Sequence, residues 1–163
     1  MHENRWYPSD KPGTYPRIAC EVLAKGAKVA GDGQPDEKWK IAEYYRIYPE
    51  TGIDEIKQIL LQYGSFMVAC AWWESWSAAK DIMPEPRGRQ GGHNFDIVGY
   101  DDTLTVPGFY VRNSCGYRWG QTWQGWSFPC GRRTGISLMP YDMFMTWVLK
   151  TDESDYWQLV DAV

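Results

Sequence analysis

The chain has 163 residues, of which 44% are hydrophobic and 16% aromatic. This length suits one domain with its own core, and so apolar a composition excludes a disordered chain. A formal net charge of −4 offers no basic surface to nucleic acid or anionic lipid. The sequence has neither an apolar run of the roughly 18 residues that span a membrane nor a secretory leader. We therefore expect a protein or peptide as partner.

The N-terminal third predicts one helix and one strand. Residues 1–14 are polar and rich in turn formers, so they form an irregular lead-in, and 15–163 form a single domain. Pro16 begins a helix with an apolar stripe, and Gly26 ends it. The aromatic and β-branched segment 40–48 is typical of a strand.

The middle of the chain predicts a helix, a buried strand and a loop. Thr51 caps the helix, whose isoleucine and leucine residues share one face, and Gly64 ends it. Residues 66–72 form a nearly continuous apolar run, which indicates a buried strand. Residues 80–92 are rich in proline, glycine and arginine and are expected to be a loop.

Strands dominate the remainder of the prediction. Residues 93–100 and 108–112 form an antiparallel hairpin, followed by a long structured loop over 113–135. A short strand over 136–139 precedes a short helix from Pro140 through Trp147. Helices at the start followed mostly by strands predict an α+β fold with an antiparallel sheet.

The hairpin brings a histidine and an asparagine together. His93 begins one strand and Asn113 follows the end of its partner, and antiparallel pairing places these two ends side by side. A side-chain amide can accept the imidazole N–H and so fix the tautomer. The second ring nitrogen is then free to take a proton from a thiol.

The sequence around these two residues resembles the papain-like cysteine peptidases. Gly92-His93 precedes an apolar strand that ends in Gly-Tyr, as in the histidine motif of that family. The segment 113–120, Asn-Ser-Cys-Gly-Tyr-Arg-Trp-Gly, is similar to its asparagine motif, Asn-Ser-Trp-Gly-x-x-Trp-Gly. The resemblance covers residues 13–148, is strongest over 91–120 and includes bacterial and phage members. It implies a papain-like fold, with an antiparallel, barrel-like lobe and a truncated helical lobe, and catalytic roles for His93 and Asn113.

The family's nucleophile motif and its oxyanion glutamine have no counterpart here. Cys20 lies in a segment similar to the family's second helix, and Cys115 replaces the tryptophan that covers the histidine–asparagine bond. Both are candidate nucleophiles, although a buried residue is the simpler interpretation of Cys20, as it is of Cys70. The smaller Cys115 is expected to leave the bond wetter. Cys115 and Cys130 form a disulfide or stay reduced.

Other residues are expected to line a binding surface. The resemblance places Ala69 in the pocket for a substrate side chain. Trp72 and Trp119 are candidate binding residues from two tryptophan-rich segments, whose other tryptophans are at 73, 76, 123 and 126. Asp96 occupies a strand position that is usually apolar and needs a partner, for which Arg112 is the candidate. We expect no cofactor and no metal site.

Three hypotheses follow for the function. The first is an inactive papain-like domain that serves as a binding or structural module. The second is an active peptidase whose nucleophile lies on another segment or chain, or is Cys20 or Cys115. The third is glycan binding through tryptophans.

The sequence and its resemblance also suggest the source, the location and the self-association of the protein. Met1 and the early first helix suggest a complete short reading frame. The resemblance suggests a phage or bacterial protein, in the cytoplasm or in a virion. An exposed aromatic surface would favour self-association.

Overall fold

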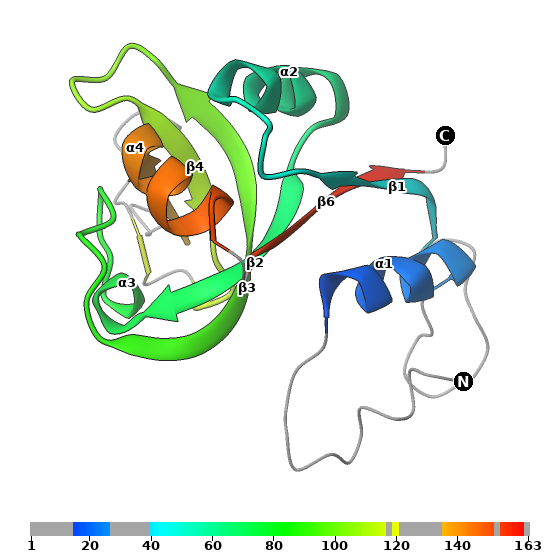
Figure 1. Ribbon diagram of the computed structural model, residues 1–163, viewed down its shortest axis with the longest axis horizontal. Coiled ribbons are helices and arrows are strands. Elements are labelled where there is room, and N and C mark those ends of the chain that lie inside the picture. The colour runs from blue at the N-terminus through cyan, green and yellow to red at the C-terminus, as the bar shows by residue number, and fades with distance from the viewer. Residues whose placement is uncertain (1–14, 27–39, 117–118, 121–134, 152–153, 162–163) are drawn as a thin grey trace, which may run out of the picture.

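The computed structural model describes residues 15–26, 40–116, 119–120, 135–151 and 154–161. The predicted lead-in over 1–14, together with Cys130, Trp123 and Trp126, lies outside these ranges. Figure 1 shows a main body of sheet and helices from which a narrow two-stranded ribbon extends to one side.

A single six-stranded sheet organises the described residues, and every adjacent pair of strands is antiparallel. The strand order is β1-β6-β2-β3-β4-β5. The strands are β1 (Ile41–Ile47), β2 (Phe66–Trp73), β3 (Arg89–Asp101), β4 (Gly108–Arg112), β5 (Ile136–Pro140) and β6 (Asp155–Asp161). The predicted α+β class is confirmed. The sheet is open and not barrel-like, because β1 and β5 end it on opposite sides without pairing within the described ranges.

The helices begin and end where the sequence supplies local signals. Helix α1 (Pro16–Lys25) has proline in its first turn, and Gly26 after it adopts a φ of 93°. Helix α2 (Ile53–Tyr63) is preceded by Gly52, whose N–H donates to Glu55 Oε2 at 3.0 Å, so Gly52 and not Thr51 is the cap. The others are α3 (Glu74–Ser77), α4 (Tyr141–Met143) and the π-helix η3 (Phe144–Leu149).

Several expected elements differ from those observed. Strand β3 begins at Arg89, inside the predicted loop over 80–92, because Trp73 on β2 pairs with Arg89. The single helix expected from Pro140 to Trp147 is a short α-helix continued by a π-helix to Leu149. Helix α3 and strand β6 were not predicted, although β6 becomes an interior strand of the sheet.

The two faces of the sheet are covered by different helices. The main core contains Ile56 of α2 together with Phe66 and Val68 of β2. On the opposite face, Cys20 of α1 packs against Met67 and Trp157 in a smaller cluster. Figure 1 shows α1 and α2 on either side of the ribbon formed by β1 and β6. Successive residues of a strand point to opposite faces, so Met67 and Val68 belong to different clusters.

A charged contact fastens α2 to the turn after β3. Lys57 Nζ lies 2.8 Å from Asp102 Oδ1 and 4.7 Å from the centre of the Tyr141 ring. The hydroxyl of Tyr141 also donates to Asp102 Oδ1 at 2.8 Å. These contacts join α2 and α4 to the hairpin that carries the histidine and the asparagine.

Among the helices that the structure describes, none has the length and apolar character needed to cross a bilayer.

Candidate functional site

His93 and Asn113 meet at one end of the β3–β4 hairpin. The register pairs Asp96 with Arg112, so the early part of β3 lies beside the residue that follows β4. His93 Nε2 is 2.9 Å from Asn113 Oδ1. Because this oxygen can only accept, Nε2 carries the hydrogen, and Nδ1 of the neutral ring is left with its lone pair. The backbone N–H of Asn113 donates to Gly135 O at 2.9 Å, which fixes the asparagine in turn.

Three tryptophan side chains, Trp72, Trp76 and Trp119, form a cluster beside His93 that we call the tryptophan wall. The Trp72 ring centre is 4.4 Å from that of His93, with 52° between the ring planes. Trp72 also contacts Trp76 edge to face at 5.5 Å, and Trp119 Nε1 donates to Trp76 O at 2.9 Å. Trp72 and Trp119 are only 6% and 4% exposed. The structure therefore places these two candidate binding residues inside the domain, where Trp72 packs on His93 and Trp119 packs on Trp72.

The histidine–asparagine bond is better shielded than the sequence suggests. Asn113 is 8% exposed, although Cys115 stands in place of the covering tryptophan. The expectation of a water-exposed bond is therefore not met at the asparagine. Asn113 Nδ2 has no hydrogen-bond partner among the described residues.

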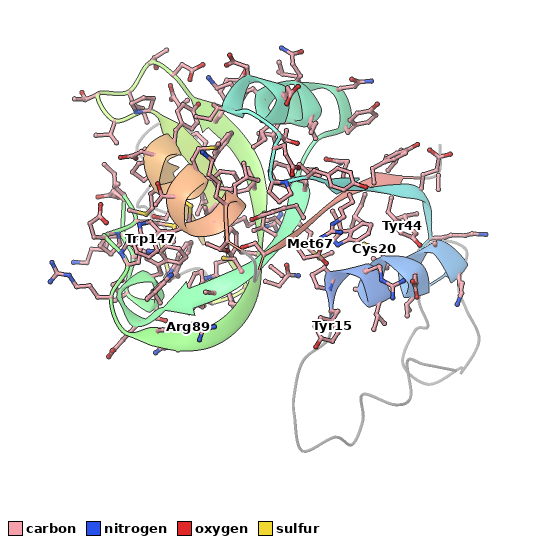
Figure 2. The ribbon with its side chains drawn as sticks, viewed as in Figure 1. Tyr15, Cys20, Tyr44, Met67, Arg89 and Trp147 are labelled. Carbon is pink, nitrogen blue, oxygen red and sulfur yellow. The ribbon has the colours of Figure 1, made fainter. Side chains whose placement is uncertain are left out.

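Cys20 lies on the other face of the sheet from His93. His93 is directly opposite Cys70 in the β2–β3 register and shares its face, whereas Cys20 packs on Met67. Met67 and Cys70 are an odd number of residues apart, so their side chains point in opposite directions. Figure 2 shows Cys20 on α1 facing the strand that carries Met67. Burial, with a smaller contribution from the charge of Asp155, raises the pKa of the Cys20 thiol to about 11.

The other two described thiols are also poorly suited to a nucleophile. Cys70 is opposite His93 but is 2% exposed, and its Sγ donates to Ala71 O at 3.2 Å. Burial raises the pKa of the Cys70 thiol to about 12, so the reactive thiolate is suppressed. Cys115 is an exposed free cysteine two residues after Asn113, and the structure gives it no hydrogen bond to His93.

Ala69 lies on the sheet face that α1 partly covers. It pairs with Asn94 on β3 and with Asp155 on β6, so these three residues form one row across the sheet. In the next row, Asp96 is opposite Arg112, as expected. Burial raises the pKa of the Asp96 carboxyl, and the positive charge of Arg112 opposes that shift. The two cross-strand partners of Ala69, Asn94 and Asp155, are therefore polar, whereas the row of Asp96 also contains Met67 and Trp157.

The described residues bring together no group of three His, Cys, Asp or Glu side chains able to hold a metal ion.

The architecture is the papain-like fold. No protein-family model and no curated protein sequence matches the chain. Xylellain, a cysteine protease from Xylella fastidiosa, is 24% identical with a TM-score of 0.58, and the match covers 99% of this chain and 56% of that one. Procathepsin B S9 from Trypanosoma congolense is 14% identical with a TM-score of 0.53, over 76% of this chain and 37% of that one. The chain thus spans less than two thirds of the length of either protein.

Sequence reasoning missed several of the residues around Ala69 and His93. Asp155 reaches its place through β6, whose position between β1 and β2 has no local signal. Asn94 could have been predicted. Successive residues of a strand point to opposite faces, so Asn94 lies on the face opposite His93, and a residue shares its face with its partner on the next strand, which here is Ala69. Trp76 was noted only as a member of a tryptophan-rich segment, whereas its carbonyl anchors Trp119.

Proposed function

We propose that this chain is a non-catalytic, peptide-binding module built on the papain-like fold. The observation that carries the proposal is the placement of the thiols: of the three described, one is on the far face of the sheet, one is buried and one has no bond to His93. A positioned histidine can activate a thiol but cannot itself form the acyl intermediate. Peptidase activity of the chain alone is expected to be absent.

The proposal is tested by covalent labelling. The chain is treated with a papain-directed epoxide and analysed by intact mass, and the same is done with His93→Ala. We expect no adduct on either protein, while iodoacetamide labels the exposed Cys115 in both. An epoxide adduct on any cysteine that disappears in His93→Ala would show an assembled catalytic pair and contradict the proposal.

Peptide binding needs a test of its own. Ala69→Phe fills the row between Asn94 and Asp155 and is expected to weaken binding of fluorescent acetyl-tetrapeptide amides at least tenfold in an anisotropy assay. Ala42→Phe is the matched control, because Ala42 is exposed on β1. Equal binding by wild type and Ala69→Phe, or no binding by a folded wild type, would refute a peptide-binding role for this face.

One observation favours a second candidate function. The His93–Asn113 hydrogen bond has the length and polarity that leave Nδ1 as a base, and this arrangement is what a cysteine peptidase needs. In this alternative, another segment or chain supplies the thiol. It predicts hydrolysis of a fluorogenic peptide only when that second component is present, and loss of that hydrolysis in His93→Ala.

A further inference from the structure

A pocket of about 170 Å³ lies between the end of β1, the turn that follows it and the second half of α2. Its volume is below the range of pockets for drug-sized molecules, so it suits a single ring. Tyr45 of β1 pairs with Gln158 of β6, both line the pocket, and Gln158 pairs in turn with Phe66 of the main core. The pocket is therefore on the face of the sheet that α2 covers (Figure 1). Ala69, three residues after Phe66 on β2, is on the other face.

Three exposed tyrosines, Tyr45, Tyr48 and Tyr63, line this pocket. The ring centres of Tyr45 and Tyr63 are 6.4 Å apart, with 38° between the ring planes. Each ring offers apolar surface and carries a hydroxyl group that can both donate and accept. The backbone N–H of Thr51 donates to Tyr48 O at 3.0 Å, and this turn brings Thr51, with a fourth hydroxyl group, into the lining. The pocket thus combines aromatic surface with groups that hydrogen-bond in both directions.

A further lining residue is a buried glutamine whose acceptor atom has no partner. Gln158 is 2% exposed, and its Nε2 donates to the carbonyl oxygens of Tyr63, Ser65 and Leu159 at 3.1, 3.2 and 2.8 Å. These three bonds fix which end of the amide is the nitrogen, and Oε1 has no hydrogen-bond partner among the described residues. Because an unpaired buried acceptor is costly, a ligand that supplies an O–H or N–H is favoured.

The charges around the pocket give no preference for an ion. None of the described residues that line it carries a carboxylate, and the one lining cation is Arg46. Arg46 follows Tyr45 on β1, so its side chain points to the other face, where Nε lies 3.4 Å from Asp155 Oδ1. Its guanidinium carbon is also 5.7 Å from the centre of the Tyr48 ring. The carboxylate of Glu43 accepts a hydrogen bond from the Tyr45 hydroxyl. Since each charge is already engaged, a neutral ligand is favoured.

We infer that this pocket binds one pyranose ring of a neutral glycan. The C–H face of a pyranose is apolar and stacks on the rings of Tyr45 and Tyr63. Its hydroxyl groups donate to Gln158 Oε1 and exchange hydrogen bonds with the hydroxyl of Thr51. A polyproline segment would also suit the aromatic surface, but proline has no N–H to donate to Gln158 Oε1. The inference goes beyond the proposed peptide binding and does not depend on it.

Titration with neutral oligosaccharides tests the inference. Cellotetraose, maltotetraose, mannotetraose and chitotetraose are added in turn to the full chain labelled with ¹⁵N. We expect at least one of them to shift the side-chain NH₂ resonances of Gln158 and the backbone resonances of Thr51 and Tyr63. The anionic tetragalacturonate, the cationic choline and an acetyl-pentaproline amide should leave these resonances in place.

Variants then show whether the sugar is bound in this pocket. Tyr63→Ala removes one exposed ring and should weaken the affinity for the bound tetrasaccharide by roughly fivefold. Thr51→Val keeps the shape of the side chain, removes its hydroxyl and should weaken the affinity by roughly threefold. Tyr15→Ala is the matched control, because it removes an exposed tyrosine that is outside the pocket, and it should leave the affinity unchanged.

Several results would overturn the inference. One is that no tetrasaccharide shifts the Gln158 resonances, and another is that Tyr63→Ala binds as tightly as the wild type. A third is that the proline peptide, choline or tetragalacturonate shifts these resonances and the neutral sugars do not. A second copy of the chain in the pocket would also overturn it, and would appear as a smaller sedimentation coefficient in Tyr63→Ala without any response to sugars. None of these results bears on the peptide assay with Ala69→Phe, so the two proposals fail separately.

Discussion

His93 is held from two sides by groups of different chemistry. Asn113 accepts its Nε2 hydrogen at 2.9 Å, and the Trp72 ring lies at a centroid distance of 4.4 Å. The amide selects the tautomer, while the indole limits rotation of the imidazole. Both contacts are made within the described residues and do not depend on a thiol.

Removal of Asn113 should change the tautomer of His93. In the wild type, ¹⁵N imidazole spectra should show a hydrogen on Nε2 and none on Nδ1 at neutral ring charge. In Asn113→Ala both tautomers should be populated, with a loss of about 1 kcal/mol in the free energy of unfolding, since one buried hydrogen bond disappears. Asn94→Ala is the exposed control. An unchanged tautomer pattern in Asn113→Ala would contradict this assignment.

Ionisation of the buried Cys70 thiol is expected to lower the stability of the fold at alkaline pH. Its pKa is raised by burial from an ordinary value of 9.0 to about 12. Between these values the folded chain binds more protons than the unfolded chain, so stability falls as the pH rises from 9 to about 12. At roughly 1.4 kcal/mol for each pKa unit, the loss reaches about 4 kcal/mol.

Urea denaturation between pH 8 and pH 11 measures this dependence. Cys70→Ala should be less stable at pH 8 because of the cavity it creates, yet its stability should fall less steeply with pH. Cys115→Ala, at an exposed position, should keep the wild-type slope. A parallel pH dependence of Cys70→Ala and wild type would contradict the role of this thiol.

At the scale of elements, one glycine fixes the path of the chain beside the site. Gly120 has a φ of +81°, and a Cβ there would lie 2.0 Å from Ile136 O. Gly116 has a similar φ of +78°, but nothing lies within 4 Å of the same position. A side chain at Gly116 would meet only backbone strain, whereas a side chain at Gly120 would meet both backbone strain and steric overlap. Gly120 also follows Trp119, the residue that closes the tryptophan wall.

Alanine at these two positions should have unequal effects on stability. Gly116→Ala is expected to cost about 1–2 kcal/mol, the usual penalty for a side chain in the left-handed region. Gly120→Ala is expected to cost more than about 4 kcal/mol, because β5 must move to relieve the overlap. Chemical denaturation checks both values. Comparable losses in the two variants would show that the loop adjusts freely.

The Lys57 contact is the second test at this scale. Lys57→Met should lower the melting temperature, because it removes the ion pair with Asp102 and the contact with the Tyr141 ring. Asp54→Asn should have less than half that effect, since Asp54 is 98% exposed and 3.7 Å from Lys57 Nζ. Differential scanning calorimetry at low and high salt measures both. If the two variants lower the melting temperature equally, the contacts of Lys57 with Asp102 and Tyr141 contribute no more to stability than its contact with Asp54.

For the whole molecule, local patterns predicted much of the fold. Proline and glycine marked α1, and the two hairpin strands followed from their apolar alternation, so the meeting of His93 and Asn113 could be derived from sequence. Strand β6 could not be placed, because its neighbours β1 and β2 are distant in sequence and no turn signal connects them. For the same reason, the place of Asp155 beside Ala69 came only from the structure. The contact between the Trp72 and His93 rings depends on the β2–β3 register, which the sequence alone does not fix.

Self-association is expected from the open edge of the sheet. Strand β1 pairs only with β6 within the described residues, whereas the far edge, β5, is bridged by residues 82–83. Exposed Tyr45 and Tyr48 lie on or next to this edge. Sedimentation velocity at micromolar concentration should show species larger than the monomer, and Tyr45→Lys should shift them toward the monomer. A stable wild-type monomer would contradict the expectation.

The position of β6 also sets an order of events during synthesis. Residues 41–47 leave the ribosome early, but the strand they pair with, residues 155–161, leaves it more than a hundred residues later. The hairpins of β2, β3, β4 and β5 can assemble in the meantime, since their pairing does not require β6. One of the first strands to be translated is therefore among the last to be placed. Until residues 155–161 are synthesised, the apolar and aromatic segment 41–47 has no strand to pair with. We therefore expect the nascent chain to bind chaperones.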